Sequence, residues 1–261
     1  MTKTLLRGRI LTFHARPCDA SDTDAFTYIE DGPLLLSDGQ IIASGPHADV
    51  AGQAPEAQVI DHRPHLLMAG FIDTHIHFPQ VQVVASWGAK LLDWLSDYTF
   101  PAPAEYPHAQ PPPPMAPLLS HLLTDHGTTT AVAFCSVHKS SAEALFSEAQ
   151  SRNMRMIAGK TMMDRNASPA VHDTAQSSYD DSTALIAQWH GRNRLSYAIT
   201  PRFAITSTPE QLEMARTLAA EHPSCFIQTH LSENHAEIVE TKRPYPQARQ
   251  YLAIYESHAL L

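Results

Sequence analysis

Basic residues are scarce in this sequence of 261 residues. Lysine and arginine number 18 against 27 acidic residues, so the formal net charge is -9 and the isoelectric point lies near 5.9. A basic face that could neutralise phosphates is therefore missing, which argues against nucleic acid or an anionic membrane as a partner. We expect the ligand to be a small molecule.

Cysteine and long apolar runs are scarce as well. Cys18, Cys135 and Cys225 are odd in number and far apart, so the sequence supports neither a disulfide framework nor a C-x-x-C metal site. The opening residues MTKTLLRGRILTF lack the apolar core of a signal peptide, and no later run approaches the ~20 apolar residues of a membrane span. We expect a soluble protein of the cytoplasm.

Hydrophobic residues make up 43% of the chain and charged residues 17%, which suffices for a sizeable core. The first ~65 residues have the periodicity of β-strands. The clearest signal is LLLSDGQIIASG, in which apolar runs flank Asp38-Gly39, a two-residue hairpin turn. So few strands form a marginal sheet by themselves, and we expect this segment to need a second layer.

From Gly70 onward, strands alternate with helices. Short apolar runs typical of buried parallel strands occur in GFIDTHIH, TTTAVAFC, MRMIAG, LSYAIT and CFIQTH. Capping sequences at Ser140-Ser-Ala-Glu143 and Thr208-Pro-Glu-Gln211 predict helix starts, and Gly191 predicts a helix end. Further helices are expected over 233–243 and 246–257. Five β/α units in this order predict a right-handed parallel sheet or barrel.

Proline is concentrated in residues 101–117, PAPAEYPHAQPPPPMAP, where the first crossover helix is expected. Proline lacks an N–H donor and disfavours helix in the residue before it, so this run favours polyproline II or disorder. A docking segment is one interpretation, and a poorly ordered insertion is the favoured one. Only Leu118 to His126, ended by Gly127, keeps a helical pattern there.

His75 and His77 stand at the end of the first of the five strands. Residues two apart in a strand point to the same face, so both imidazoles can face one ion. The alternative is a chance alternation on a half-buried strand, and H-x-H by itself does not decide between the two.

His230 ends the fifth strand, and Glu233 follows it. Parallel α/β folds bind ligands at the carboxyl ends of their strands, where His77 and His230 both fall. Three imidazoles can hold zinc and leave a position for water, whose pKa the ion lowers towards ~7; iron would suit the same ligands. Glu233 is then a candidate proton carrier, or else a partner of a helix dipole.

The segments GFIDTHIHFPQ, GTTTAVAFC, NMRMIAGKTMMDRNA, YAITPRFAITSTPEQL and QTHLSEN together resemble the amidohydrolase superfamily and, within it, the guanine deaminases. The resemblance covers nearly the whole chain and implies an α/β fold, the amidohydrolase-type (β/α) TIM barrel. It implies that the ligands of one zinc ion are His75, His77 and His230. The implied substrate contacts are Gln80, Arg202, Phe203 and His230. Glu233 matches the catalytic proton shuttle.

The implied reaction is hydrolytic deamination of guanine to xanthine and ammonia. An aromatic wall such as Phe203 suits a planar base, and an arginine such as Arg202 suits a carbonyl on its edge. One alternative is another amidohydrolase acting on a nitrogen heterocycle, of the cytosine, 8-oxoguanine or triazine type. The other is a non-catalytic fragment.

The resemblance further implies eight β/α units, with another histidine after the sixth strand and an aspartate after the eighth at the metal. We therefore interpret residues 69–261 as an incomplete barrel of about five units. Residues 1–68 would be part of a small N-terminal β-sandwich domain. An incomplete barrel exposes a sheet edge and an apolar face, so we expect self-association, such as a homodimer. We expect little or no turnover from this chain alone.

Overall fold

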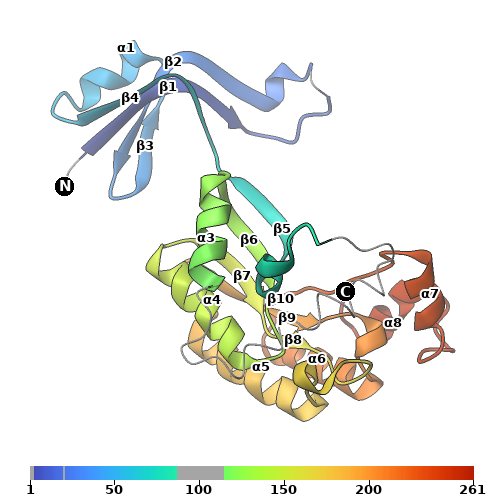
Figure 1. Ribbon diagram of the computed structural model, residues 1–261. Helices are drawn as coiled ribbons and strands as arrows, with labels where there is room; N and C mark the ends of the chain where they lie inside the picture. The colour runs from blue at the N-terminus through green and yellow to red at the C-terminus, as the bar shows by residue number, and fades with distance from the viewer. Residues whose placement is uncertain (1–2, 20, 87–114) are drawn as a thin grey trace. The chain divides into compact units, whose positions relative to one another are not determined.

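The computed structural model describes residues 3–19, 21–86 and 115–261 (Figure 1). Contacts divide the chain into two compact units, Met1–Gly70 and Phe71–Leu261. Most of the proline-rich segment, residues 101–114, lies outside the described residues. No helix in the described part of the chain is long and apolar enough to cross a membrane.

The first unit is a four-stranded sheet in the order β3-β2-β1-β4. Its strands are β1 (Lys3–Phe13), β2 (Phe26–Ser37), β3 (Gln40–Ser44) and β4 (Gln58–Met68). Strand β2 is antiparallel to β1 and β3, whereas β4 runs parallel to β1. A short helix, α1 (His47–Val50), precedes β4. The predicted β-rich start of the chain is thus confirmed.

The predicted hairpin joins β2 and β3, where Ser37 pairs with Gln40 across Asp38 and Gly39. Both turn residues have positive φ, 51° and 75°, a conformation that aspartate and glycine tolerate better than most residues. The core of this unit is small, and its buried apolar side chains within the described residues are Leu5, Ile10, Ala25, Leu35, Val50 and Ala54. So small a core gives the sheet little stabilisation from burial.

The second unit contains a parallel sheet in the order β10-β9-β7-β6-β5, and β8 (Thr161–Met162) pairs with β9. Its other strands are β5 (Phe71–His77), β6 (Thr128–Phe134), β7 (Arg155–Gly159), β9 (Leu195–Pro201) and β10 (Phe226–Ile227). These are the five predicted strands, but the fifth is shorter than predicted: β10 ends at Ile227, so His230 follows the strand and does not end it. Strands β5 and β10 form the edges of the described sheet.

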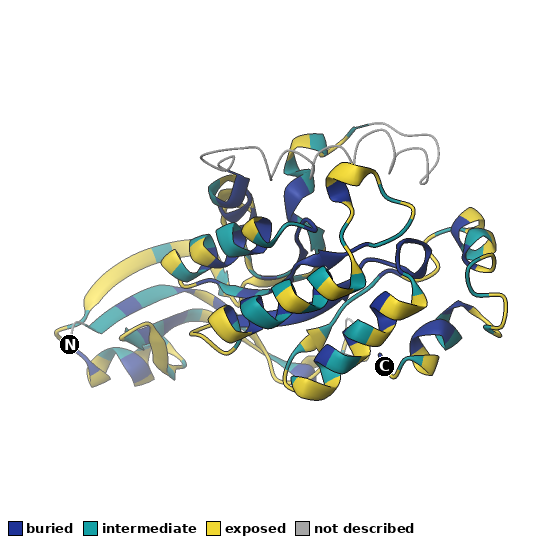
Figure 2. Cartoon of the chain, turned by 90° about the horizontal axis from the view of Figure 1, so that it is seen from below, coloured by how far each residue is buried: buried dark blue, intermediate teal, exposed yellow. Residues whose placement is uncertain are grey.

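Four long helices pack on this sheet: α3 (Met115–Asp125), α4 (Lys139–Ser151), α5 (Ala175–Trp189) and α6 (Pro209–Glu221). Two shorter helices, α7 (His235–Thr241) and α8 (Tyr251–Ser257), follow β10 (Figure 1). Figure 2 shows buried stripes on the long helices and a largely buried centre of the sheet. Every residue of β9 is buried, because helices cover one face and other strands surround it.

Gly159 allows β7 and β9 to approach closely. A Cβ atom at this position would lie 1.8 Å from the carbonyl oxygen of Ala198 and 2.3 Å from Oγ1 of Thr200. No side chain fits there, so the last residue of β7 must be glycine.

The start of α6 and the end of α5 agree with the sequence. Oγ1 of Thr208 accepts a hydrogen bond from the N–H of Gln211 at 3.2 Å, and Pro209 is the first helical residue. Gly191, just after α5, has φ of 72° and ends that helix as predicted.

The helix start predicted at Ser140 is wrong. Helix α4 begins at Lys139, and its N-cap residue His138 makes no side-chain capping bond. The neighbouring Ser141 is buried, and its hydroxyl accepts from the N–H of Ser136 at 3.1 Å. The strand-to-helix connection is therefore held by that contact and not by a capping box.

Both helices after β10 begin later than predicted. Ser232 has φ of 57°, outside the helical region, and the chain enters α7 only after Asn234. The side chain of Asn234 accepts from the N–H of Glu237, and α8 likewise starts only at Tyr251. An N-cap with its own hydrogen bond sets the boundary more firmly than apolar periodicity does.

Candidate metal centre

Three histidines meet beside the carboxyl ends of two strands. His75 and His77 lie at the end of β5, and His230 lies three residues after β10. Their nitrogen atoms all lie within 4.8 Å of one another, the one such His, Cys, Asp or Glu group found in the described part of the chain. Nε2 of His77 lies 2.9 Å from Nε2 of His230. The structure therefore brings together all three predicted ligands.

One carbonyl oxygen contacts both the ring and the main chain of His230. Its Nδ1 lies 2.6 Å from the carbonyl oxygen of Arg202, and its main-chain N–H donates to the same oxygen at 2.9 Å. Because a carbonyl oxygen can only accept, Nδ1 carries the proton and the lone pair of Nε2 faces His77. Burial, followed by the charge of Arg202, lowers the pKa of His230 to about 3. Its imidazole is therefore neutral, the form that binds metals.

Phe134, the last residue of β6, packs against all three imidazoles. The distances between ring centroids are 5.1 Å to His75, 4.8 Å to His77 and 4.5 Å to His230. Burial, followed by the charge of Arg202, holds the pKa of His77 well below its ordinary value. Sequence reasoning missed Phe134, and its one signal is its position at a strand end, beside His77 in the sheet.

The donor set fits a zinc ion. Zinc binds imidazole nitrogens at ~2.0–2.1 Å, so two ligands of a tetrahedral ion lie ~3.3 Å apart. The observed spacing of 2.9 Å between Nε2 of His77 and Nε2 of His230 is close to that value. Because Nε2 of His230 carries a lone pair, a contact this short requires either a proton on Nε2 of His77 or a cation between the two nitrogens. Three neutral imidazoles would suit iron as well.

The predicted substrate residues lie around the histidines. Gln80, in the turn Phe78–Val83, lines a hollow of about 380 Å³ together with His75 and His77. Phe203 is buried, and its ring lies edge-on to that of His230 at 6.2 Å. The rest of the hollow is mainly apolar, and its volume lies in the range of small-molecule sites.

Arg202 contributes two different groups to the site. Its carbonyl oxygen orients His230, as described above, and its guanidinium is buried in the same region. Burial lowers the pKa of Arg202 to about 10, while the charge of Glu233 acts in the opposite direction. The guanidinium thus stays charged near neutral pH.

Glu233 lies before α7 and outside the helix. Asn234 caps the helix, and Glu237 occupies its first turn and completes the capping box. Oε2 of Glu237 also accepts from the N–H of Glu233 at 2.6 Å. Although the side chain of Glu233 is exposed, partial loss of water and the charge of Glu237 raise its pKa. Glu237, and not Glu233, is the acidic partner of this helix start.

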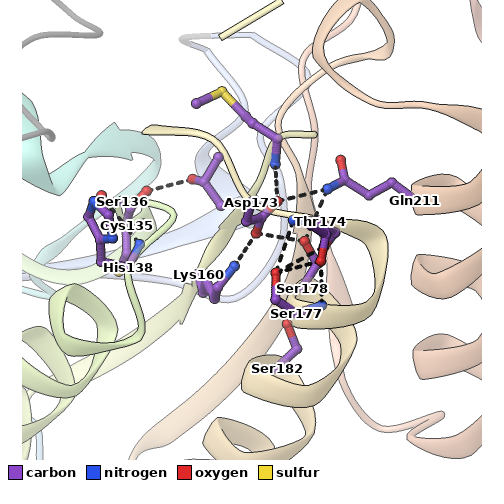
Figure 3. Close-up of polar contacts among 12 residues, drawn as sticks. Cys135, Ser136, His138, Lys160, Asp173, Thr174, Ser177, Ser178, Ser182 and Gln211 are labelled. Atoms are coloured by element: carbon purple, nitrogen blue, oxygen red, sulfur yellow. Dashed lines mark hydrogen bonds and ion pairs between the residues drawn. The ribbon is translucent and has the colours of Figure 1, made fainter. Parts of the chain in front are cut away.

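A buried ion pair fixes the loop that follows β7 (Figure 3). Nζ of Lys160, a residue 1% exposed, pairs with the carboxylate of Asp173. The same carboxylate accepts from Ser178 at 2.6 Å and from Nε2 of Gln211 at 3.0 Å. A buried charge is tolerated when its remaining lone pairs are hydrogen-bonded, as they are here. Gln211 therefore serves this network, and its side chain does not complete the cap of α6.

The same loop clamps the turn that follows Phe203. The guanidinium of Arg165 donates to the carbonyl oxygens of Ala204 at 2.6 Å and Ile205 at 3.1 Å, and also to that of Ser207. These contacts join residues about 40 positions apart. Nothing local in the sequence marks Arg165 for this role.

The sequence matches a family model of the Amidohydrolase family over residues 66–260. That match covers most of the chain, which therefore belongs to the amidohydrolase family.

Within this family the chain is similar to guanine deaminases. The guanine deaminase of Escherichia coli (strain K12) is 46% identical over 237 residues, which are 90% of this chain and 54% of that enzyme. The structure of guanine deaminase from Bradyrhizobium japonicum has 37% identity and a TM-score of 0.96, covering 100% of this chain and 57% of its own. The structure from C. acetobutylicum, with bound guanine in the active site, has 25% identity and a TM-score of 0.89, covering 99% and 60%. The chain spans about half the length of the curated relatives that it matches.

Proposed function

We propose that this chain carries the metal-binding part of a guanine deaminase, which hydrolyses guanine to xanthine and ammonia. The observation that supports this best is the convergence of His75, His77 and His230 beside a hollow of small-molecule size. The similarity to guanine deaminases, one of them with bound guanine, favours guanine as the substrate. We accordingly propose a small-molecule ligand, no nucleic-acid partner and a cytoplasmic location.

The proposed roles follow from the geometry. His75, His77 and His230 would hold one zinc ion, which supplies a Lewis acid that makes a nearby water molecule more acidic. Phe203 would contact the plane of the base, and Gln80 and the guanidinium of Arg202 would hydrogen-bond its edge.

Glu233 would move the protons. The water oxygen forms a bond to the ring carbon that bears the amino group, and the bond from this carbon to the amino nitrogen breaks. Glu233 accepts a proton from the water and donates it to the departing nitrogen, which leaves as ammonia. The raised pKa of Glu233 suits a group that must be both base and acid near neutral pH.

We propose that the parallel sheet of the second unit is part of a (β/α) barrel, with about five of eight units in this chain. Residues 69–261 would form that barrel part, and residues 1–68 part of a small β-sandwich domain. The contacts divide the chain two residues later, after Gly70.

Ammonia release from guanine by purified, zinc-loaded protein tests the proposal. We expect little turnover from this chain alone, and whatever turnover it has should fall by ~100-fold or more in Glu233→Gln, because a general acid–base group typically contributes that much. Glu240→Gln is the matched control, because Glu240 lies on the same segment and pairs with Arg243 near the surface of α7. Unchanged turnover in Glu233→Gln would remove this residue from the mechanism.

The same assay separates the alternatives. Preferred turnover of cytosine, 8-oxoguanine or a triazine would identify another heterocycle amidohydrolase. Zinc binding without turnover of any substrate would favour a non-catalytic fragment. The observation that favours a non-catalytic fragment is that the chain covers only about half the length of its relatives.

A further inference from the structure

A buried tyrosine hydroxyl connects His230 to the last helix of the structure. Tyr255 lies in α8 and is 1% exposed. Its hydroxyl donates to the carbonyl oxygen of His230 at 2.9 Å. It accepts from the main-chain N–H of Ala204 at 3.1 Å and from the hydroxyl of Thr229 at 3.0 Å. The one donor and both lone pairs of the hydroxyl are thereby used.

These partners lie on both sides of the contact that orients His230. Thr229 and His230 follow β10, whereas Ala204 follows β9. Arg202, whose carbonyl oxygen faces Nδ1 of His230, lies two residues before Ala204 in the segment that follows β9. The hydroxyl of Tyr255 therefore joins the segment that carries the imidazole to the segment that carries its acceptor. A shift of either segment would turn Nε2 away from His77.

We propose that Tyr255 is a positioning residue for the metal site. Its hydroxyl fixes the main chain of His230 relative to the carbonyl oxygen of Arg202, so that Nε2 faces His75 and His77. This inference rests on the proposed function, which requires a metal at these histidines. Groups that orient metal-binding histidines typically contribute ~10–100-fold to metal affinity.

The competing explanation is that Tyr255 only fills the core. Its ring stacks on that of Tyr251 at 5.9 Å, and both residues belong to the main hydrophobic cluster. Tyr251 is 7% exposed, and its hydroxyl interacts with Glu237 and Thr241 but makes no hydrogen bond to Thr229, His230 or Ala204. The two tyrosines thus share a helix and a core but differ in what their hydroxyls hold.

Zinc affinity, measured by competition with a chelating dye, separates the two explanations. Tyr255→Phe keeps the ring and removes the hydroxyl, so we expect zinc binding ~10–100-fold weaker. Tyr251→Phe should bind zinc within about twofold of the unchanged protein, because the hydroxyl of Tyr251 makes no hydrogen bond to Thr229, His230 or Ala204. The visible absorption band of bound Co²⁺ should shift in Tyr255→Phe only, since it reports ligand geometry.

Thr229→Val provides a second test should Tyr255→Phe fail to fold. It keeps the core ring and removes a hydroxyl that lies 3.0 Å from that of Tyr255 and 3.3 Å from the carbonyl oxygen of Arg202. We expect a smaller, several-fold loss of zinc affinity. If folded Tyr255→Phe and Thr229→Val both bind zinc as tightly as the unchanged protein, the positioning role is wrong. The metal site itself would not be contradicted by that result. An unchanged protein that binds no zinc would overturn the metal site and this inference together.

Discussion

His230 shows how much of a binding site is decided around a single residue. Its ring is buried, its Nδ1 faces a carbonyl oxygen, and its Nε2 faces another imidazole. Each contact restricts either the orientation of the ring or its tautomer, so the side chain already has the form that the proposed metal site requires. His75, by contrast, is exposed at its edge strand.

Replacing His230 with alanine should weaken zinc binding strongly, because three protein ligands become two. Metal content after dialysis, measured by elemental analysis, should fall from about one zinc per chain to well below one. His65→Ala is the control, since His65 is exposed in the first unit. Unchanged zinc content in the His230 variant would remove this residue from the site.

At the scale of elements, the helix starts show where a local capping pattern sets the boundary of a helix and where tertiary contacts do. Two sequences, at Ser140 and at Thr208, have the pattern of an N-cap. The side chain of Thr208 caps α6 as predicted. The main-chain N–H of Thr208 also donates to Oδ1 of Asp164 at 2.7 Å. Ser140 is exposed and lies inside α4. The same sequence pattern therefore contributes differently to the free energy of unfolding at the two positions.

Thr208→Ala should destabilise the protein by about 1 kcal/mol, the usual cost of losing a helix cap. Ser140→Ala should change stability by no more than about 0.5 kcal/mol, because an exposed helix position accepts alanine well. Urea unfolding followed by tryptophan fluorescence measures both, since all three tryptophans belong to residues 71–261. Equal effects of the two substitutions would contradict the capping assignment.

At the scale of the whole molecule, large apolar side chains remain exposed. In the first unit, Ile41 is 61% exposed and Val59 60%, and in β5 of the second unit Ile72 is 65% exposed. Exposed apolar side chains along strands favour association with other chains. Such a surface is consistent with the self-association expected from the sequence.

Sedimentation velocity at several concentrations should therefore show a species larger than the monomer. Val59→Lys should shift the distribution towards monomer by placing a charge on an exposed strand. Gln53→Lys, an equally charged change at an exposed position outside the strands, should not. A single monomeric species at all concentrations would contradict the prediction.

The order of strands and helices was predictable from the sequence, because apolar periodicity and turn residues act over a few neighbouring positions. The hairpin at Asp38-Gly39, the cap at Thr208 and the end at Gly191 are all local of this kind. The three histidines were also predicted as ligands, since each stands at or near the end of a predicted strand. Helix boundaries were less accurate where tertiary contacts intervened, as at Ser141 and Asn234.

The sequence by itself thus determined which residue types stand near the carboxyl ends of which strands. It thereby determined which functional groups are present for metal binding and proton transfer. Only the tertiary structure decided how that chemistry is arranged. His77 and His230 are 153 residues apart, and the contacts of Phe134, Arg165 and Tyr255 likewise join distant segments. No local pattern encodes such contacts, because they arise only when β5, β9 and β10 pack into one sheet. The tautomer of His230 depends on that packing, and so does its value as a ligand.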